Sequence, residues 1–152
     1  MKVWRICRAK FAPEAFSGIG ARRFGGRWNS PGVPMVYSSS SLALAAMELF
    51  VHLEPNQQPD DLVSIMATLP RGEPARRLEP NHLPRGWWKD DFAPPRAIGD
   101  KWIKEKSSLA IEVRSAALRT EWNVLVNPLH PRIAEIKVEE PVAFNFDARM
   151  FR

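Results

Sequence analysis

One carboxylate lies in the middle of a segment that otherwise has the pattern of an apolar helix. Glu48 stands within LALAAMELFVHL, and the serines that come before this segment, Ser40 or Ser41, are of a residue type that caps helices. Apolar residues fall on nearly all sides of a helix over 41–53, so we expect this helix to be central and buried. A buried carboxylate is costly unless a cation pairs with it or chemistry uses it. Glu48 is therefore the first candidate catalytic residue.

The helix itself offers Glu48 no cationic partner. The positions three and four residues away, which share its face, carry Leu44, Ala45, Val51 and His52. A partner must come from another element, and Arg27 or a bound substrate is the natural candidate.

A basic, glycine-rich stretch precedes the helix. Residues 16–32 read FSGIGARRFGGRWNSPG and hold five of the eight glycines. The stretch is neither a P-loop nor a dinucleotide fingerprint between a strand and a helix. Its guanidinium groups, on Arg22, Arg23 and Arg27, could bind a pyrophosphate in a bidentate manner. An exposed surface loop explains Arg23 better, whereas Arg27 precedes the bulky Trp28, as in an ordered and packed turn.

Three further polar residues stand in or beside expected strands. Tyr37 lies at the end of a short strand over 34–38, Ser115 follows a strand over 108–113, and Asn123 lies in a strand over 122–126. Each also has an ordinary structural explanation: a tyrosine at the edge of the core, a turn serine, and an asparagine that satisfies buried backbone groups.

The elements that must position these residues show no repeat. We expect further strands over 1–8, 62–69 and 133–138, with residues 142–146 paired nearby, and a loop-rich segment with six prolines over 70–99. Several strands that do not alternate with helices indicate an α+β fold. A chain of 152 residues is most economically one domain, covering 1–152.

The composition excludes several classes of protein. Apolar residues make up 45% of the chain, which is too many for disorder, yet no apolar run approaches the roughly 18 residues of a membrane span. Cys7 is the only cysteine, and the three histidines have no metal-ligand spacing. We therefore expect a cytoplasmic protein without a membrane segment or a metal site.

The positive charge is concentrated near the N-terminus. Residues 1–37 carry seven Lys and Arg against one acid, a charge of +6, and the other 115 residues carry 15 basic and 16 acidic groups, a charge of −1. Such a patch attracts nucleic acid, a phosphorylated small molecule or an acidic partner, although a solvated surface explains it equally well.

Several segments, in this order, resemble the RES domain family: FSGIGARRFGGRWNSPGVPMVYSSSSLALAAMELFVHL, LPRGWW, AIGDKWIKEKSS and LAIEVRSAALRTEWNVLVNPLHP. The similarity extends to about residue 146 and so covers nearly the whole chain. The family is named after an arginine, a glutamate and a serine. These fall on Arg27, Glu48 and Ser115, and the family's aromatic residue falls on Tyr37.

The resemblance implies a fold similar to that of ADP-ribosyltransferases and a role as the toxin of a bacterial toxin–antitoxin pair. Such toxins degrade NAD by hydrolysis or phosphorolysis of the nicotinamide–ribose bond and arrest growth. The resemblance also implies NAD as the substrate, no metal, and an Xre-type helix-turn-helix antitoxin encoded beside the toxin. DNA would then be contacted only through the antitoxin.

The same resemblance suggests a role for each candidate residue. Glu48 would stabilise the positive charge that develops on the ribose, and Arg27, with Arg22, would bind the pyrophosphate. Tyr37 would contact the nicotinamide. Ser115 would bind ribose or nicotinamide or orient Glu48, and Asn123 would line the NAD site.

Two alternative functions stay open at this point. The first is a protein ADP-ribosyltransferase that uses the same NAD site and a protein acceptor. The second is a nucleic-acid-binding or RNA-cleaving toxin, which the pI near 9.8 favours. The confinement of the charge to one segment and the lack of a recognition motif oppose the second alternative.

Overall fold

The computed structural model of the protein describes residues 1–54, 56 and 58–152. The strands are β1 (Lys2–Arg8), β2 (Val36–Ser39), β3 (Leu62–Thr68), β4 (Arg76–Arg77), β5 (Ala110–Arg114), β6 (Trp122–Val126), β7 (Lys137–Val138) and β8 (Val142–Ala143). The α-helices are α1 (Ile19–Phe24), α2 (Leu42–Phe50) and α3 (Ala93–Glu105). Short 3₁₀ helices are η1 (Ala9–Glu14), η2 (Pro80–His82), η3 (Ile133–Glu135) and η4 (Ala148–Phe151).

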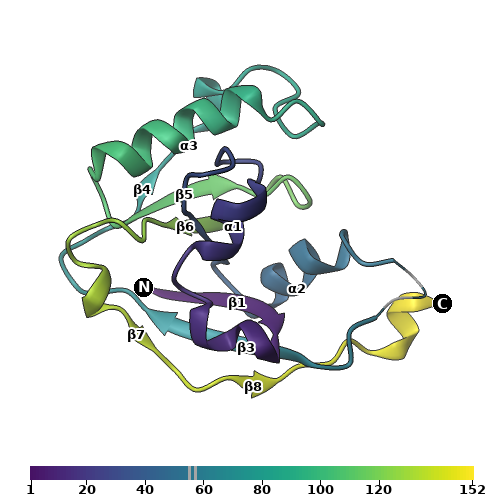
Figure 1. The fold of residues 1–152 in the computed structure, drawn as a ribbon. Helices are drawn as coiled ribbons and strands as arrows, with labels where there is room; N and C mark the ends of the chain where they lie inside the picture. The colour runs from purple at the N-terminus through teal and green to yellow at the C-terminus, as the bar shows by residue number, and fades with distance from the viewer. Residues whose placement is uncertain (55, 57) are drawn as a thin grey trace.

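The described strands form one mixed sheet in the order β4-β5-β6-β2-β1-β3-β7, with β8 also paired to β3. Every pairing is antiparallel except that of β4 with β5. In Figure 1, α3 lies at the β4–β5 end of the sheet and α2 lies beside β1. This arrangement confirms the predicted α+β fold.

The centre of the sheet buries side chains on both of its faces. Val36 pairs with Val126, and both belong to one apolar cluster. The next pair in register is Tyr37 with Leu125, and these residues belong to a second cluster with Trp28. Because side chains alternate along a strand, the two clusters lie on opposite faces. Tyr37, Leu125 and Trp28 therefore lie on one face of the sheet, opposite Val36 and Val126.

Helix α2 is shorter and more exposed than the pattern predicts. The hydroxyl oxygen of Ser41 accepts a hydrogen bond from the Leu44 amide at 3.1 Å, so of the two predicted candidates Ser41 is the cap. The helix ends at Phe50, however, and Val51 is 54% exposed. Within α2 only Leu44 and Ala45 are fully buried. The expected bounds of 41–53 and the expected burial of this helix are therefore wrong, because α2 covers the sheet with one side only.

Helix α3 lies partly inside the segment that was expected to be loop. Pro94 and Pro95 occupy its first turn, where the missing amide hydrogens would have had no partner within the helix. Prolines that suggested a loop therefore begin a helix of 13 residues. Among the described residues, no helix is both long and apolar enough to cross a membrane.

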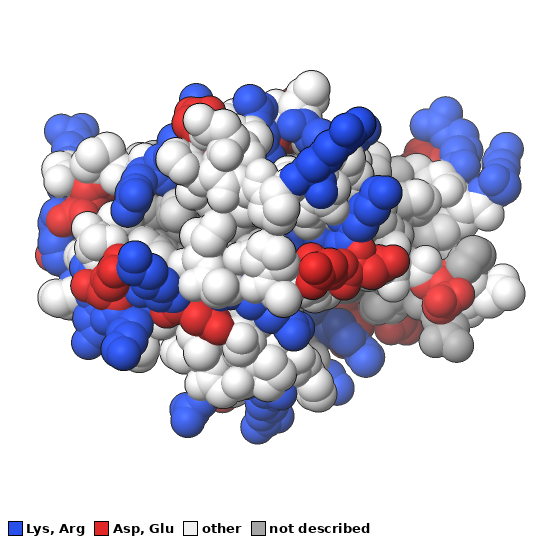
Figure 2. Space-filling view, turned by 90° about the horizontal axis from the view of Figure 1, so that it is seen from above, with Lys and Arg blue, Asp and Glu red and all other residues white. Residues whose placement is uncertain are grey.

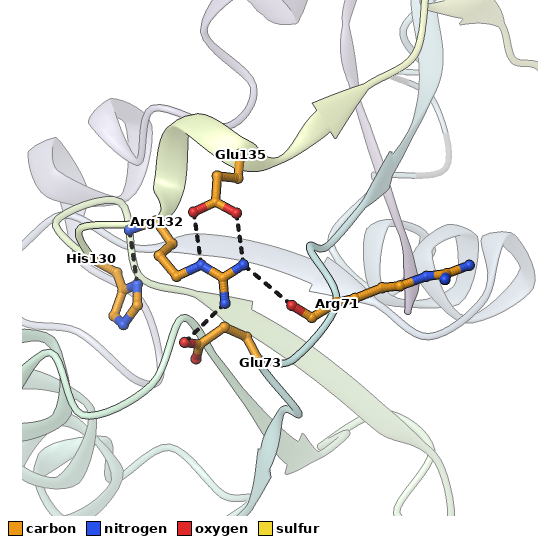
Figure 3. A network of polar contacts seen from close by, with 5 residues as sticks. All are labelled: Arg71, Glu73, His130, Arg132 and Glu135. Atoms are coloured by element: carbon orange, nitrogen blue, oxygen red, sulfur yellow. Dashed lines mark hydrogen bonds and ion pairs between the residues drawn. The ribbon is translucent and has the colours of Figure 1, made fainter.

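The predicted strand over 133–138 is mostly a turn. Residues Ile133–Glu135 form η3, and only β7 remains extended; β8 pairs with β3 and not with β7. The Arg132 guanidinium contacts both carboxylate oxygens of Glu135, at 2.8 and 2.7 Å, and reaches Glu73 at 3.2 Å (Figure 3). This network ties the chain after β3 to the turn before β7. The apolar alternation in the sequence does not reveal the contact between Arg132 and Glu73, which are 59 residues apart.

Candidate active site

The Glu48 carboxylate is held by two neutral donors from other elements. The Ser115 hydroxyl donates to Oε1 of Glu48 at 2.5 Å, and the Asn123 side-chain amide donates to the same oxygen at 2.6 Å. Oε2 has no hydrogen bond to the described residues and is accessible to solvent. The partners of Glu48 thus come from outside its helix, as expected, but they are Ser115 and Asn123 rather than Arg27.

The sheet register brings these residues together. Ser115 follows the last residue of β5, and Asn123 is the second residue of β6. Asn123 is paired with Val113 on β5 and with Ser39 on β2, so its side chain lies between the two strands on one face of the sheet. The Ser115 amide donates to the Glu121 carbonyl at 3.0 Å, which closes the turn between β5 and β6.

Sequence reasoning missed Ser39. Its hydroxyl donates to the Asn123 carbonyl oxygen Oδ1 at 2.7 Å, and the residue is only 4% exposed. Ser39 stands two residues after Tyr37 on the same strand, and residues i and i+2 share a face. The sequence could therefore have placed Ser39 on the same face as the candidate residue Tyr37.

The Tyr37 hydroxyl is bound to the glycine-rich loop. It donates to Oδ1 of Asn29 at 2.7 Å and accepts from the Trp28 amide at 2.9 Å. A Cβ on Gly26 would lie 2.5 Å from this hydroxyl, so the loop packs on Tyr37 without room for a side chain there. Burial raises the pKa of Tyr37 to about 12. The hydroxyl therefore holds the loop, and the ring remains the part of Tyr37 that could face a ligand.

Arg27 is anchored at one nitrogen and open at the others. Its Nη1 donates to the carbonyls of Trp87 at 3.1 Å and Lys89 at 2.7 Å. Its guanidinium carbon Cζ lies over the Phe92 ring, 4.5 Å from the ring centroid. Nε and Nη2 have no hydrogen bond to the described residues and are accessible to solvent. Burial lowers the pKa of Arg27, and the charges of Glu48 and Asp90 partly oppose this effect. Glu48 is therefore within electrostatic reach of Arg27 without a direct ion pair.

Arg22 lies apart from these contacts. It is on α1, and its exposed side chain makes no hydrogen bond or ion pair with the described residues. Its backbone carbonyl accepts from the Gly32 amide at 2.7 Å. Gly18 and Gly25, which flank this helix, have φ angles of 75° and 71° that favour glycine. The glycines therefore shape the loop that presents Arg22 and Arg27.

The arrangement suits the binding of an anion and the stabilisation of a cation. The free guanidinium nitrogens of Arg27 can bind a phosphate, and a fixed carboxylate with one open oxygen can oppose a developing positive charge. A hollow of about 600 Å³ lies beside Phe92, and none of the candidate residues named from the sequence lines it. In the described part of the chain, no three His, Cys, Asp or Glu residues gather as a metal site requires.

The chain is similar to known proteins over nearly its whole length. Toxin Res of Yersinia enterocolitica is 31% identical over 153 residues, which cover 99% of each chain. The Prs ADP-ribosylating toxin of a Sphingobium species is 34% identical over 157 residues, which cover 98% of this chain and 96% of that protein. The fold matches a chain in the crystal structure of the M. tuberculosis MbcT–MbcA toxin–antitoxin complex with a TM-score of 0.68, at 22% identity, over 99% of this chain and 86% of that chain. Because the RES domain profile matches residues 2–147, the chain belongs to the RES domain family.

Proposed function

We propose that this protein is the toxin of a bacterial toxin–antitoxin pair and that it cleaves the nicotinamide–ribose bond of NAD. The observation that carries the proposal is the Glu48 carboxylate, which Ser115 and Asn123 hold by one oxygen while the other stays open. The names of the relatives support a toxin, and the ADP-ribosylating activity in the name of the Sphingobium protein favours NAD as the substrate.

Glu48 acts on the charge that develops at the ribose. When the bond from C1′ to the nicotinamide nitrogen breaks, its electron pair moves to the pyridine ring and nicotinamide leaves neutral. The ribose is left with oxocarbenium character, as in glycoside cleavage. The open oxygen of Glu48 opposes this positive charge. An acceptor then adds to C1′ and loses its proton; water, phosphate and a protein side chain are the alternatives.

The basic residues bind the other end of the substrate. Arg27 presents Nε and Nη2 to the pyrophosphate while its Nη1 contacts keep the guanidinium plane in place. Arg22 adds positive charge from α1. The ring of Tyr37 faces the nicotinamide, and Ser115 orients Glu48.

A second candidate is transfer of ADP-ribose to a protein at the same site. The name of the Sphingobium relative, an ADP-ribosylating toxin, specifically favours this reaction. Incubation with NAD labelled in the adenine separates the two reactions, because transfer leaves the label on protein and hydrolysis leaves it in free ADP-ribose.

Nucleic-acid binding has less support. On the face that includes α3, Figure 2 shows Lys and Arg side chains interspersed with Asp and Glu rather than a continuous basic stripe. A nucleic-acid-binding protein would show an affinity for oligonucleotide that falls steeply with salt, without NAD consumption.

The proposed partner is an antitoxin. The matched fold comes from a toxin–antitoxin complex, which supports such a partner for this chain. We propose an Xre-type antitoxin encoded nearby, through which alone the pair would contact DNA, and a cytoplasmic site of action, where NAD is present.

The Glu48→Gln variant tests the mechanism. The side-chain carbonyl of Gln can take the place of Oε1 and accept from Ser115 and Asn123, so the variant should fold. Loss of the charge should lower kcat for nicotinamide release by about 10²-fold or more and change NAD affinity much less. Chromatography of nicotinamide after mixing with NAD, together with thermal unfolding, measures both effects. A folded variant that consumes NAD at nearly the normal rate would make Glu48 structural.

A further inference from the structure

We propose that Ser39 is a positioning residue that orients Glu48 through the side-chain amide of Asn123. The proposal rests on the proposed function, because the reaction it concerns is cleavage of NAD. It differs from the sequence prediction for Asn123, which placed that residue against the substrate.

The chain of hydrogen bonds has a defined direction. Ser39 donates to Oδ1 of Asn123 at 2.7 Å, and Nδ2 of Asn123 donates to Oε1 of Glu48 at 2.6 Å. Oδ1 has no other donor among the described residues. Removal of the Ser39 hydroxyl therefore leaves a carbonyl oxygen without its partner, and the amide must rotate to find another.

Ser115 completes the support from the other side. Its hydroxyl oxygen accepts from the Leu118 amide at 2.8 Å, so its single proton is directed to Oε1 of Glu48. Two donors hold Oε1 in place, and Oε2 has no hydrogen bond to the described residues. The carboxylate shifts when either donor moves, so Ser39 influences the reaction although it does not touch Glu48.

Ser38 provides a matched comparison on the same strand. It is also buried, and its hydroxyl donates to the Val124 carbonyl at 2.6 Å on the opposite face of the sheet. Ser38→Ala and Ser39→Ala therefore each remove one buried hydrogen bond from β2. Only Ser39→Ala removes a hydrogen bond to Asn123, the residue that donates to Glu48.

A double-mutant cycle measures the coupling. Ser39→Ala should lower kcat for nicotinamide release by about 10- to 100-fold, with KM for NAD nearly unchanged, because the carboxylate is misplaced after binding. Ser38→Ala should keep kcat close to that of the wild type. In an Asn123→Ala background, Ser39→Ala should change kcat by less than about 2-fold, because its path to Glu48 is already removed. An unchanged kcat in Ser39→Ala, or full additivity with Asn123→Ala, would overturn the proposal.

A readout without turnover separates this inference from the proposed function. In the wild type, the Asn123 side-chain amide proton that faces Glu48 should be shifted downfield in nitrogen–proton correlation spectra and should exchange slowly. Ser39→Ala should abolish both features, and Ser38→Ala should keep them. A wild type that does not consume NAD defeats the proposed function, whereas an amide signal unchanged by Ser39→Ala defeats the role of Ser39.

Discussion

At the scale of single residues, the contacts of Glu48 leave its charge available. A direct ion pair with Arg27 would neutralise the carboxylate and use the guanidinium that a phosphate would need. The structure instead gives Glu48 two neutral donors and gives Arg27 two backbone carbonyls. Each charged group is therefore held in place without being paired to the other. Such preorganised charges are what stabilisation of a charged transition state requires.

Titration of Tyr37 tests the packing of the glycine-rich loop. Because Tyr37 is the only tyrosine, absorbance of tyrosinate reports this residue alone. Burial raises its pKa to about 12, so the signal should appear near pH 12 in the folded protein. In denaturant it should appear near pH 10, the ordinary range for tyrosine. A midpoint near pH 10 in the folded protein would contradict the buried hydroxyl.

The same titration has a consequence for stability. A pKa that is higher in the folded state means that the unfolded state releases its proton first as pH rises. The stabilising contribution of Tyr37 is therefore complete below about pH 10 and is lost as pH rises toward about 12. Tyr37→Phe, which cannot ionise, should remove this part of the alkaline loss in the free energy of unfolding.

At the scale of elements, α3 and the glycine-rich loop support each other. Nε of Arg96 on α3 donates to the Gly26 carbonyl at 2.8 Å, and Asp100 accepts from the amide and hydroxyl of Ser30. Gly99 lies directly against the Trp28 carbonyl. The helix missed in the sequence is therefore the element that holds the loop of Arg27.

Gly99→Ala should separate these two elements. A Cβ at this position would lie 1.8 Å from the Trp28 carbonyl oxygen, so α3 or the loop must move. We expect the free energy of unfolding to fall by about 1–3 kcal/mol or more, as for overpacked cores. Gly20→Ala on α1 is the control, since nothing lies within 4 Å of its added Cβ. Urea unfolding of both variants measures the difference, and equal stability of the two would contradict the close contact.

The C-terminal segment supports α2 in a comparable way. Phe50, the last residue of α2, packs at a tilt against Phe146 and Phe151, with ring centroids 5.8 and 5.3 Å apart. In Figure 1 the C-terminus lies near the end of α2. The helix of Glu48 is therefore capped by Ser41 at its start and packed by aromatic rings at its end.

At the scale of the whole molecule, we expect an acidic partner to dock on the exposed basic side chains of the N-terminal quarter, although Arg5 is buried and Arg8 pairs with Asp61. Arg22 and Arg23 are exposed on α1, and Phe24 beside them is 80% exposed. An exposed aromatic residue among arginines is a combination that interfaces favour. An acidic stretch of the antitoxin that docks here would lie next to the loop of Arg27.

This placement predicts competition between the antitoxin and NAD. The purified complex should release nicotinamide far more slowly than the free toxin, and Arg23→Glu should weaken the complex while the free toxin keeps its activity. Parallel assays of nicotinamide release and of binding at several salt concentrations measure both effects. Equal turnover by the complex and the free toxin would rule out occlusion.

Features that depend on a few neighbouring residues could be predicted from the amino-acid sequence. Apolar residue patterns predicted β1, β3 and β6, and the serine cap at position 40 or 41 and the position of Glu48 in a helix were also correct. These patterns act within one strand or one turn of helix, so they are visible along the chain.

The contacts between side chains far apart in the sequence depend on how the whole chain packs. The hydrogen bonds that join Glu48 to Ser115, Glu48 to Asn123, and Ser39 to Asn123 span 67, 75 and 84 residues. Their formation depends on the register of β2, β5 and β6 and on the packing of α2 against the sheet. Likewise, α3 was hidden because its prolines stand in the one turn that tolerates them. The residue types of the site are local features of the chain, but their hydrogen bonds are a property of the packed sheet.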